Sequence, residues 1–364
     1  MSENSSGENL FEEKKEKRVK NKTNIKCLGC GGELVYSISH HALFCPNCGR
    51  TLKFKAENGV IKKEYFDNLD NQTNNEEKTT NCSSCGAKLK VNNREITKTC
   101  PYCSSNFVLD RSEIVGLKPD VILPFALDKI RAIEKYRQNV KKKWFLPNKF
   151  KKTPNLDNIN GTYISCFIFD SKTHSSYSGT LGEVVSRTSN GKTYTDIKYK
   201  HISGKKDVDF ENFEIESSSQ ASQALFKQVK PYQINDETCY HYNENFLRGF
   251  CVESNDKSVA ECKAICEDEM KSEIKSKILS TYSYSFVQEF NLKTSFEDNK
   301  FSYILLPIYF IDFKYGKKDY RVYLNGQTGK LGDNLPKSKV KIGFAIFFGL
   351  LLISLFIYLF YLKG

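Results

Sequence analysis

The sequence contains little of what marks low-complexity or secreted chains. Among 364 residues there are only 21 glycines and 9 prolines, too few for a low-complexity protein. The N-terminal stretch MSENSSGENLFEEKKEKR has no apolar core and therefore cannot be a secretory signal. Residues 1–20 hold five basic and five acidic side chains and almost no apolar ones, so we expect a disordered tail there.

Motifs for catalysis are also lacking. The chain has no phosphate-cradling glycine-rich loop and no His-Glu-x-x-His metal helix. Three of its five histidines, His174, His201 and His241, lie within residues 155–335, and none stands beside a nucleophile motif. We therefore expect that the protein is not an enzyme and has no catalytic residues.

Cysteine, by contrast, is abundant, with 13 residues. Without a secretory signal the compartment is expected to be reducing, and Cys-x-x-Cys pairs there indicate metal ligands rather than disulfides. The stretch KCLGCGGEL at residues 26–34 is answered 55 residues later by NCSSCGAKL at residues 81–89. Each first pair is followed after fourteen residues by a second pair, so the predicted metal ligands are Cys27, Cys30, Cys45, Cys48, Cys82, Cys85, Cys100 and Cys103.

Two such pairs complete one tetrahedral site of four thiolates. The glycine that follows three of the pairs (Gly31, Gly49, Gly86) permits the tight turn that lets two thiolates hold one ion. A site closed by four thiolates has no open coordination position and is structural. The prediction is two structural Zn²⁺ ions, with iron as the open alternative, because the ligand spacing alone does not exclude it.

Short alternating runs between the pairs predict β-hairpins, so each copy looks like a small zinc ribbon, at residues 21–56 and 81–110. Units of this size bury too little apolar surface to fold without their metal. Because four thiols already fill the first site, His40 and His41 are expected at a polar hairpin tip.

Residues 57–80 are predicted to be a linker between the ribbons. Asn58-Gly59 near its start is a candidate hairpin turn. From Asp67 onward the segment is polar and is expected to be flexible.

The C-terminus carries a long uncharged run. Ile342 to Leu362 is 21 residues without a charge, enough as a helix to cross a bilayer. Lys337, Lys339 and Lys341 precede the run and only Lys363 and Gly364 follow it. By the positive-inside rule we expect a tail-anchored, single-pass protein of the cell membrane with a cytosolic N-terminal part.

Residues 111–154 form a basic segment. Residues 111–155 hold twelve Lys and Arg against four Asp and Glu. A helix is predicted over 123–144 with Ile130, Ile133, Tyr136 (or Arg137) and Val140 on one stripe. Its basic face is either simply solvated or attracted to a polyanion, and next to a membrane anionic lipid is favoured over nucleic acid. The predicted lipid or polyanion contacts are Lys141, Lys142, Lys143, Lys149, Lys151 and Lys152.

Residues 155–335 are predicted to be one α+β domain with an antiparallel sheet. GTYISCFIFD reads as an apolar strand, and Asn190-Gly191 lies between two further strand-like runs. Residues 258–278 predict an amphipathic helix, on which Cys262 and Cys266 are expected to be packed apolar residues rather than ligands.

The order of these parts resembles a bacterial family of zinc-ribbon membrane proteins. The resemblance rests on CLGCGGEL with FCPNCG, CSSCGAKL with TCPYCSS, KPDVILPFALDKIRAIEKY, YILLPIYFIDFKY, YLNGQTGKLGDNLP and the terminal span. Ribbons of this family are compared with those of general transcription factor B and of the primosomal helicase. Some members are associated with phage-shock protein A and with a flotillin-like SPFH protein. One departure is Ser104, which stands where the family's fourth cysteine pair is followed by glycine.

Two functions follow as expectations. The resemblance implies a membrane-anchored adaptor with protein partners of the phage-shock protein A or SPFH kind, in a membrane-stress or envelope-maintenance complex. The alternative is a membrane-tethered nucleic-acid-binding protein. Residues 21–110 carry twelve basic and nine acidic residues, and since nucleic-acid affinity depends on neutralising phosphates, this small excess favours the adaptor.

Overall fold

The fold was analysed in a computed structural model. It describes residues 26–59, 61–66, 78–82, 86–91, 95–102, 106–109, 114, 117–148, 159–189, 192–218, 221–253 and 255–363. A cysteine cluster near the N-terminus, a large antiparallel sheet and a C-terminal apolar helix follow one another along the chain. This order agrees with the predicted fold class at that level.

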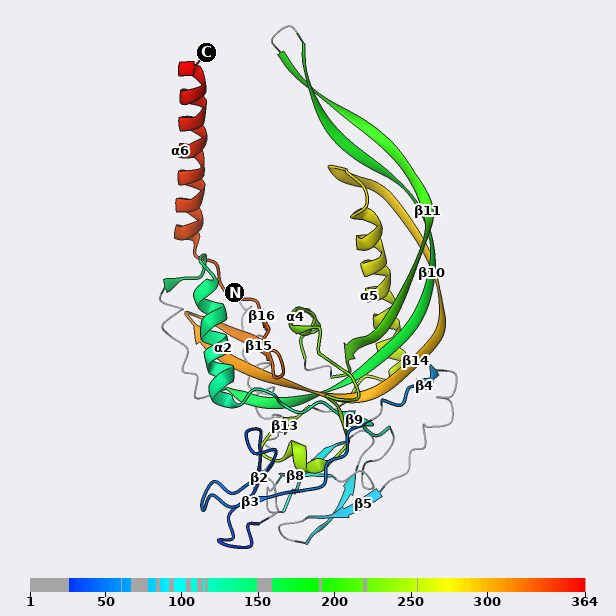
Figure 1. The fold of residues 1–364 in the computed structure, drawn as a ribbon, viewed down its shortest axis with the longest axis vertical. Coiled ribbons are helices and arrows are strands. Elements are labelled where there is room, and N and C mark those ends of the chain that lie inside the picture. The colour runs from blue at the N-terminus through cyan, green and yellow to red at the C-terminus, as the bar shows by residue number, and fades with distance from the viewer. Residues whose placement is uncertain are drawn as a thin grey trace, which may run out of the picture.

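Three very long strands build the sheet: β10 (Asn160–Ser189), β11 (Lys192–Glu216) and β14 (Phe286–Tyr315). β10 lies between the other two and pairs antiparallel with both. β15 (Lys318–Asn325) and β16 (Leu331–Asp333) continue the sheet beyond β14. Figure 1 shows the three long strands side by side, curving in the same direction.

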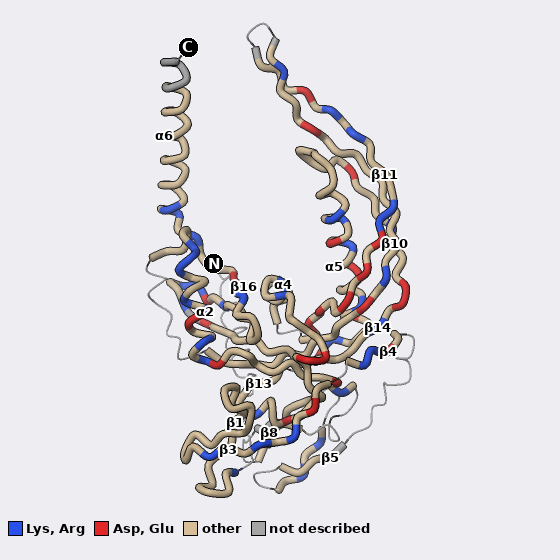
Figure 2. Tube along the Cα trace, viewed as in Figure 1, with Lys and Arg blue, Asp and Glu red and all other residues tan. Residues whose placement is uncertain are grey.

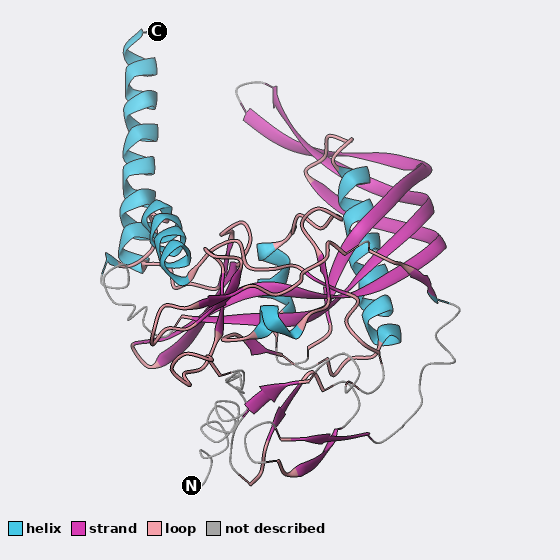
Figure 3. Cartoon of the chain, turned by 60° about the horizontal axis from the view of Figure 1, so that its bottom comes forward, coloured by secondary structure: helices cyan, strands magenta, loops and turns pink. Residues whose placement is uncertain are grey.

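Beyond Gly182, which pairs with Phe286 at the start of β14, only β10 and β11 continue among the described residues. Glu183–Ser189 and Lys192–Lys198 thus form a two-stranded extension, here called the distal ribbon. It rises from the body on the same side as the C-terminal helix in both Figure 1 and Figure 3. Ser189 pairs with Lys192, as expected for a two-residue hairpin, although Asn190 and Gly191 themselves lie outside the described residues.

Two aligned bulges bend the sheet. β11 holds an extra residue opposite Asp170 of β10, and β14 holds one opposite the next residue, Ser171. These bulges contain Asn212 (φ 50°) and Asp298 (φ 55°). Asn and Asp tolerate this left-handed backbone better than most residues. Asp170 stabilises the bend because its Oδ1 accepts from Asn212 N at 2.8 Å and its Oδ2 lies 2.5 Å from Lys63 Nζ.

Helix α5 (Val259–Leu279) covers the concave face of the sheet. Ser258 caps it, because its hydroxyl accepts from Glu261 N while the Glu261 carboxylate accepts from Ser258 N. The side that meets the sheet is the predicted apolar stripe, made by Val259, Cys262, Cys266, Met270 and Ile274, and Ile278 extends it. The helix predicted from periodicity is therefore confirmed, with Cys262 and Cys266 buried in the packed stripe.

Shorter elements complete the body. Helix α4 (Gln223–Val229) packs on β15 and β16, and the 3₁₀ helix η3 (Glu244–Leu247) packs beside the first ribbon. The short strands that add to the large sheet are β4 (Glu64–Tyr65), β9 (Val121–Ile122), β12 (Tyr240–His241) and β13 (Cys251–Val252).

The segment after the first ribbon belongs to this sheet. Asn58 bridges Tyr240, Gly59 N donates to Cys239 O, and β4 pairs with β14. Asn58-Gly59 thus pairs with a distant part of the chain, where local turn preference alone suggested a hairpin.

Helix α2 (Lys129–Lys142) is shorter than the predicted 123–144. It begins after Asp128 because that side chain caps it, accepting from Arg131 N at 2.8 Å. Tyr136 and Val140 of the predicted stripe are buried, whereas Ile130 is exposed and Ala132 takes its place in the core.

Helix α6 (Lys339–Lys363) forms the C-terminus. Its segment Lys339–Tyr358 has a mean hydropathy of 2.5 and is not buried against the rest of the protein. The helix is long and apolar enough to cross a membrane.

Candidate metal centre

The first cysteine cluster is built on two knuckle turns with the same backbone hydrogen bonds. Gly31 N donates to Cys27 O and Gly49 N donates to Cys45 O, both at 2.9 Å. Gly31 and Gly49 have φ of 71° and 74°, which only glycine adopts without strain. The glycines therefore let each chain segment fold back so that both thiols of a pair point the same way.

Hairpin strands hold the two knuckles face to face. β1 (Val35–Ser37) pairs antiparallel with β2 (Ala42–Phe44), and β3 (Thr51–Leu52) pairs with β2. The predicted hairpin in this ribbon is confirmed. His40 and His41 lie in its turn, where they contact Ser37 and Tyr36.

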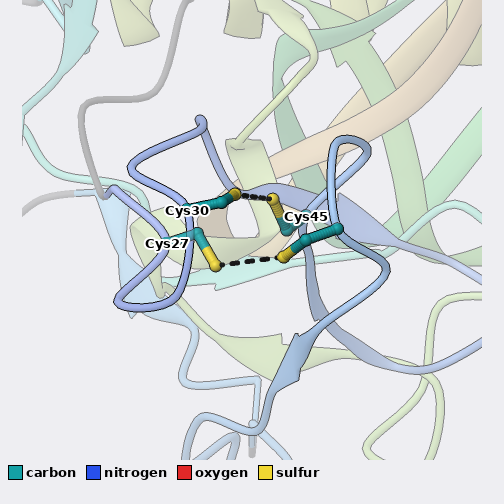
Figure 4. A group of neighbouring side chains, drawn as sticks. Cys27, Cys30 and Cys45 are labelled. Atoms are coloured by element: carbon teal, nitrogen blue, oxygen red, sulfur yellow. Dashed lines mark hydrogen bonds between the residues drawn. The ribbon is translucent and has the colours of Figure 1, made fainter.

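The four thiols converge on one point (Figure 4). The Sγ atoms of Cys27 and Cys48 lie 3.6 Å apart and those of Cys30 and Cys45 lie 3.4 Å apart. All four are within 4.8 Å of one another. A tetrahedron with metal–sulfur bonds of about 2.3 Å has sulfur–sulfur edges of about 3.8 Å, so the cluster could hold one metal ion with shifts of a few tenths of an ångström.

Backbone amides favour the thiolate form that a metal requires. Gly29 N donates to Cys27 Sγ at 3.4 Å and, together with the amide of Cys30, lowers the pKa of Cys27 to about 6. The amide of Cys48 is the main cause that lowers the pKa of Cys45. The knuckle amides thus lower the pKa of Cys27 and Cys45. At Cys30 the amide of Gly32 acts in the same direction, but the neighbouring thiols of Cys45 and Cys48 outweigh it and raise the pKa to about 12.

The second cysteine set is described in part. Gly86 N donates to Cys82 O at 2.7 Å and Gly86 has a φ of 75°, repeating the geometry of the first two knuckles. Cys82 and Cys100 are buried. Cys85, Cys103 and Ser104 lie outside the described residues. One four-cysteine cluster is therefore seen, and the second site remains a prediction.

Strand pairing in the second unit differs from that in the first. β5 (Lys78–Asn81) pairs with β6 (Lys88–Val91), and β7 (Thr97–Thr99) pairs with β8 (Asn106–Val108). Each strand between the two cysteine pairs thus pairs across its own knuckle, as β2 does with β3 in the first unit. The hairpin predicted between the cysteine pairs, seen as β1–β2 in the first unit, is not among the strand pairings of the described residues of the second.

The first ribbon is docked on the body, which the sequence did not indicate. Tyr36 is buried, its ring contacts Phe246 of η3 at a centroid distance of 5.1 Å, and its N–H donates to Arg248 O at 2.9 Å. Phe54 joins this aromatic cluster. The aromatic Tyr36 in an otherwise polar ribbon was a sign in the sequence of a buried contact. Its partners could not be identified because they lie some 200 residues away.

The predicted polyanion contacts lie at the end of α2 and beyond it. Lys141, Lys142 and Lys143 are exposed, and Lys143 Nζ lies 2.6 Å from Asp333 of β16. Lys149, Lys151 and Lys152 lie outside the described residues. The structure therefore brings three of the six lysines together, and one of them is engaged in an ion pair.

Comparison with known proteins adds little to these observations. No family model matches the chain, and no solved structure matches it significantly. The uncharacterized protein YdjG of Bacillus subtilis (strain 168) is 24% identical over 222 residues, which are 61% of this chain and 64% of YdjG. The chain thus spans less than two thirds of the length of this relative, and the similarity assigns neither a family nor a function.

Proposed function

We propose that this protein is a non-enzymatic, membrane-anchored adaptor whose zinc ribbons present binding surfaces to proteins at the cytosolic face. The observation that carries the proposal is the closed four-cysteine cluster with Leu28 at its tip, 93% exposed. A site with four thiolate ligands has no position for a substrate and serves to stiffen the surface around it.

Zinc is the favoured ion, and two ions are favoured over one. Zinc prefers four thiolate ligands in a tetrahedron and, unlike iron, does not change its oxidation state. The knuckle at Cys82 has the backbone hydrogen bond and left-handed glycine of the first cluster, which supports a second site completed by Cys85, Cys100 and Cys103.

Both ribbons expose a large apolar side chain at a knuckle tip. Leu28 lies between Cys27 and Cys30, and Tyr102, which is 76% exposed, lies between Cys100 and Cys103. Apolar and aromatic side chains on a rigid support are typical anchors of protein interfaces. Two weak contacts on one tether bind more tightly than either does alone.

Helix α6 supplies the anchor in this proposal. The lysines before it and the single lysine after it favour a cytosolic body. By resemblance, the partners are a phage-shock protein A-like or a flotillin-like SPFH protein, in a complex that responds to membrane stress.

A pull-down of the full-length protein in mild detergent tests the adaptor function. Leu28→Asp with Tyr102→Asp should remove the partners while zinc content stays unchanged, and Cys27→Ser with Cys82→Ser should remove both partners and zinc. Tyr194→Asp, on the distal ribbon, is the matched control for an exposed apolar residue.

Three results would count against the adaptor. Partners that survive both double substitutions would show that the ribbons are not the recruiting surface. Retention of oligonucleotide that falls steeply with salt would favour the nucleic-acid alternative. If the purified wild-type protein contains no zinc, the proposed zinc centre is wrong.

A further inference from the structure

We propose that Trp144 and Phe145 form a second, interfacial contact with the bilayer that α6 enters, at the level where lipid headgroups meet acyl chains. The proposal rests on the membrane anchoring proposed above and adds to it a site on the body of the protein.

The loop after α2 is fixed to the start of α6. Ser338 N donates to Phe145 O at 2.7 Å. Lys341 Nζ donates to the carbonyl oxygens of Trp144 and Leu146 at 3.0 and 2.9 Å, and to Asn148 Oδ1 at 2.6 Å. The loop therefore lies beside the last charged residue before the apolar run that begins at Ile342.

These contacts decide which side chains of the loop meet solvent. Leu146 is buried and fastens the loop to the body, whereas Trp144 and Phe145 are 57% and 43% exposed. Their rings contact each other edge to face, with centroids 5.0 Å apart. A pair of exposed rings on an anchored loop is an apolar surface without a partner in the described part of the chain.

The bilayer is the occupant that the position favours. Trp, with an apolar ring and a polar N–H, prefers the headgroup region, and Phe can enter the upper acyl chains. If α6 crosses the bilayer from Ile342 onward, the loop bonded to Ser338 and Lys341 lies at that boundary.

Charge near the loop agrees with this occupant. Lys141 and Lys142 are exposed on the last turn of α2, directly before the aromatic pair. Basic residues close to an anionic lipid surface are attracted to it. The ammonium groups of Lys143 and Lys341 are engaged by Asp333 and by the loop oxygens.

Tryptophan fluorescence provides a direct test, because Trp144 is the only tryptophan in the chain. The full-length protein is reconstituted in phosphatidylcholine–phosphatidylglycerol vesicles that contain lipids brominated either near the top or near the end of the acyl chain. Emission from Trp144 should be quenched about twofold more by the shallow bromine than by the deep one, since interfacial residues sit about 5–10 Å deep.

Two variants separate this inference from the anchor itself. Leu352→Trp in a Trp144→Phe background lies at the middle of the run 342–362, reports insertion of α6 and should be quenched best by the deep bromine. Tyr65→Trp in the same background, on β4 and away from the loop, should be quenched by aqueous iodide and by neither lipid.

Each other outcome overturns the inference. Deep quenching at position 352 without lipid quenching of Trp144 would leave the anchor and remove the interfacial contact. Protection of Trp144 from iodide without lipid quenching would assign the rings to a protein contact. Absence of lipid quenching at both positions would remove the anchor and the interfacial contact together.

Discussion

At the scale of single residues, the most exacting positions are the glycines that close the knuckles. Gly31, Gly49 and Gly86 all have positive φ, and no atom lies within 4 Å of a Cβ built on any of them. A side chain there would meet open space, so any cost of substitution comes from the backbone alone.

Gly49→Ala should therefore weaken metal binding by about tenfold, corresponding to about 1–2 kcal/mol for an alanine held in the left-handed region. Gly49→Asn should weaken it by much less, because Asn adopts this conformation more readily. Competition with a coloured chelator measures both affinities. Equal weakening by the two variants would mean that the knuckle does not need a left-handed residue there.

Glu214 is a carboxyl on β11 that is buried in the folded protein, so its protonation affects the stability of the fold. Burial raises its pKa, and this effect is only partly opposed by Tyr232 N, which donates to its Oε1 at 2.9 Å, and by nearby Lys230 and Lys330. Because the pKa of Glu214 is higher in the folded than in the unfolded protein, the folded state is favoured when this carboxyl is protonated. This contribution to the free energy of unfolding is complete below the unfolded-state pKa of about 4.3 and is lost as pH rises through the folded-state pKa.

Glu214→Gln imitates the protonated form and can keep the bond from Tyr232 N. Its melting temperature should match that of the wild type near pH 4.5 and exceed it increasingly towards pH 7. Glu183→Gln, at an exposed position on the distal ribbon, is the control and should leave the difference at zero across the same range. A wild-type protein that gains stability relative to Glu214→Gln as pH rises would contradict the assignment.

At the scale of elements, the bend of the sheet depends on Asp170. Asp170→Ala removes an ionised acceptor from Asn212 N and a partner from Lys63, and should lower the free energy of unfolding by about 2–3 kcal/mol. Asp170→Asn keeps an acceptor for Asn212 N and should cost less than about 1 kcal/mol. Urea unfolding of the two variants gives the comparison, and equal losses would assign the stability to the ion pair instead.

Sequence periodicity predicted some elements well and others poorly. Helix α5 was predictable because its apolar residues recur every three or four positions and Ser258 caps it. β10 was not predictable at full length, because its middle buries Ser171, Thr173 and Ser175 in place of apolar residues. Their hydroxyls are satisfied across the sheet, for example Thr173 Oγ1 by donating to Val208 O at 2.6 Å.

The candidate sites also include a part that the sequence could predict and a part that it could not. The four thiols of the first cluster follow from spacing alone, since a knuckle is a local turn. The loop at Trp144 could not be placed, because its partners Ser338 and Lys341 are nearly 200 residues away and the contacts involve backbone oxygens that carry no sequence signal.

At the scale of the whole molecule, the first ribbon and the body are coupled through Tyr36. Removing the metal should therefore loosen more than the ribbon. With a chelator, hydrogen exchange should rise at residues 27–52 and also at η3, because Tyr36 no longer holds Phe246 and Arg248.

Tyr36→Ala should confine the effect of the chelator to the ribbon itself. Leu52→Ala, at an exposed position of the same ribbon, should leave the coupling intact. Exchange mass spectrometry of the detergent-solubilised full chain resolves both segments. Unchanged exchange at η3 in the wild type after metal removal would show that the ribbon docks without supporting the body.

In the proposed membrane-anchored arrangement, the distal ribbon limits the orientations that the body can take relative to the bilayer. It rises on the same side of the body as α6 and carries charges, among them Arg187, Asp196 and Lys198 (Figure 2). A charged two-stranded extension is excluded from hydrocarbon, so if α6 crosses a bilayer as proposed, the angle between α6 and the distal ribbon must differ from the one in Figure 1. Ser338 N donates to Phe145 O, so the proposed lipid contact of Trp144 and Phe145 lies at the base of α6 whatever that angle is. Three parts of the chain that are far apart in sequence, the loop after α2, the start of α6 and the distal ribbon, would then together set how the body is oriented on the bilayer.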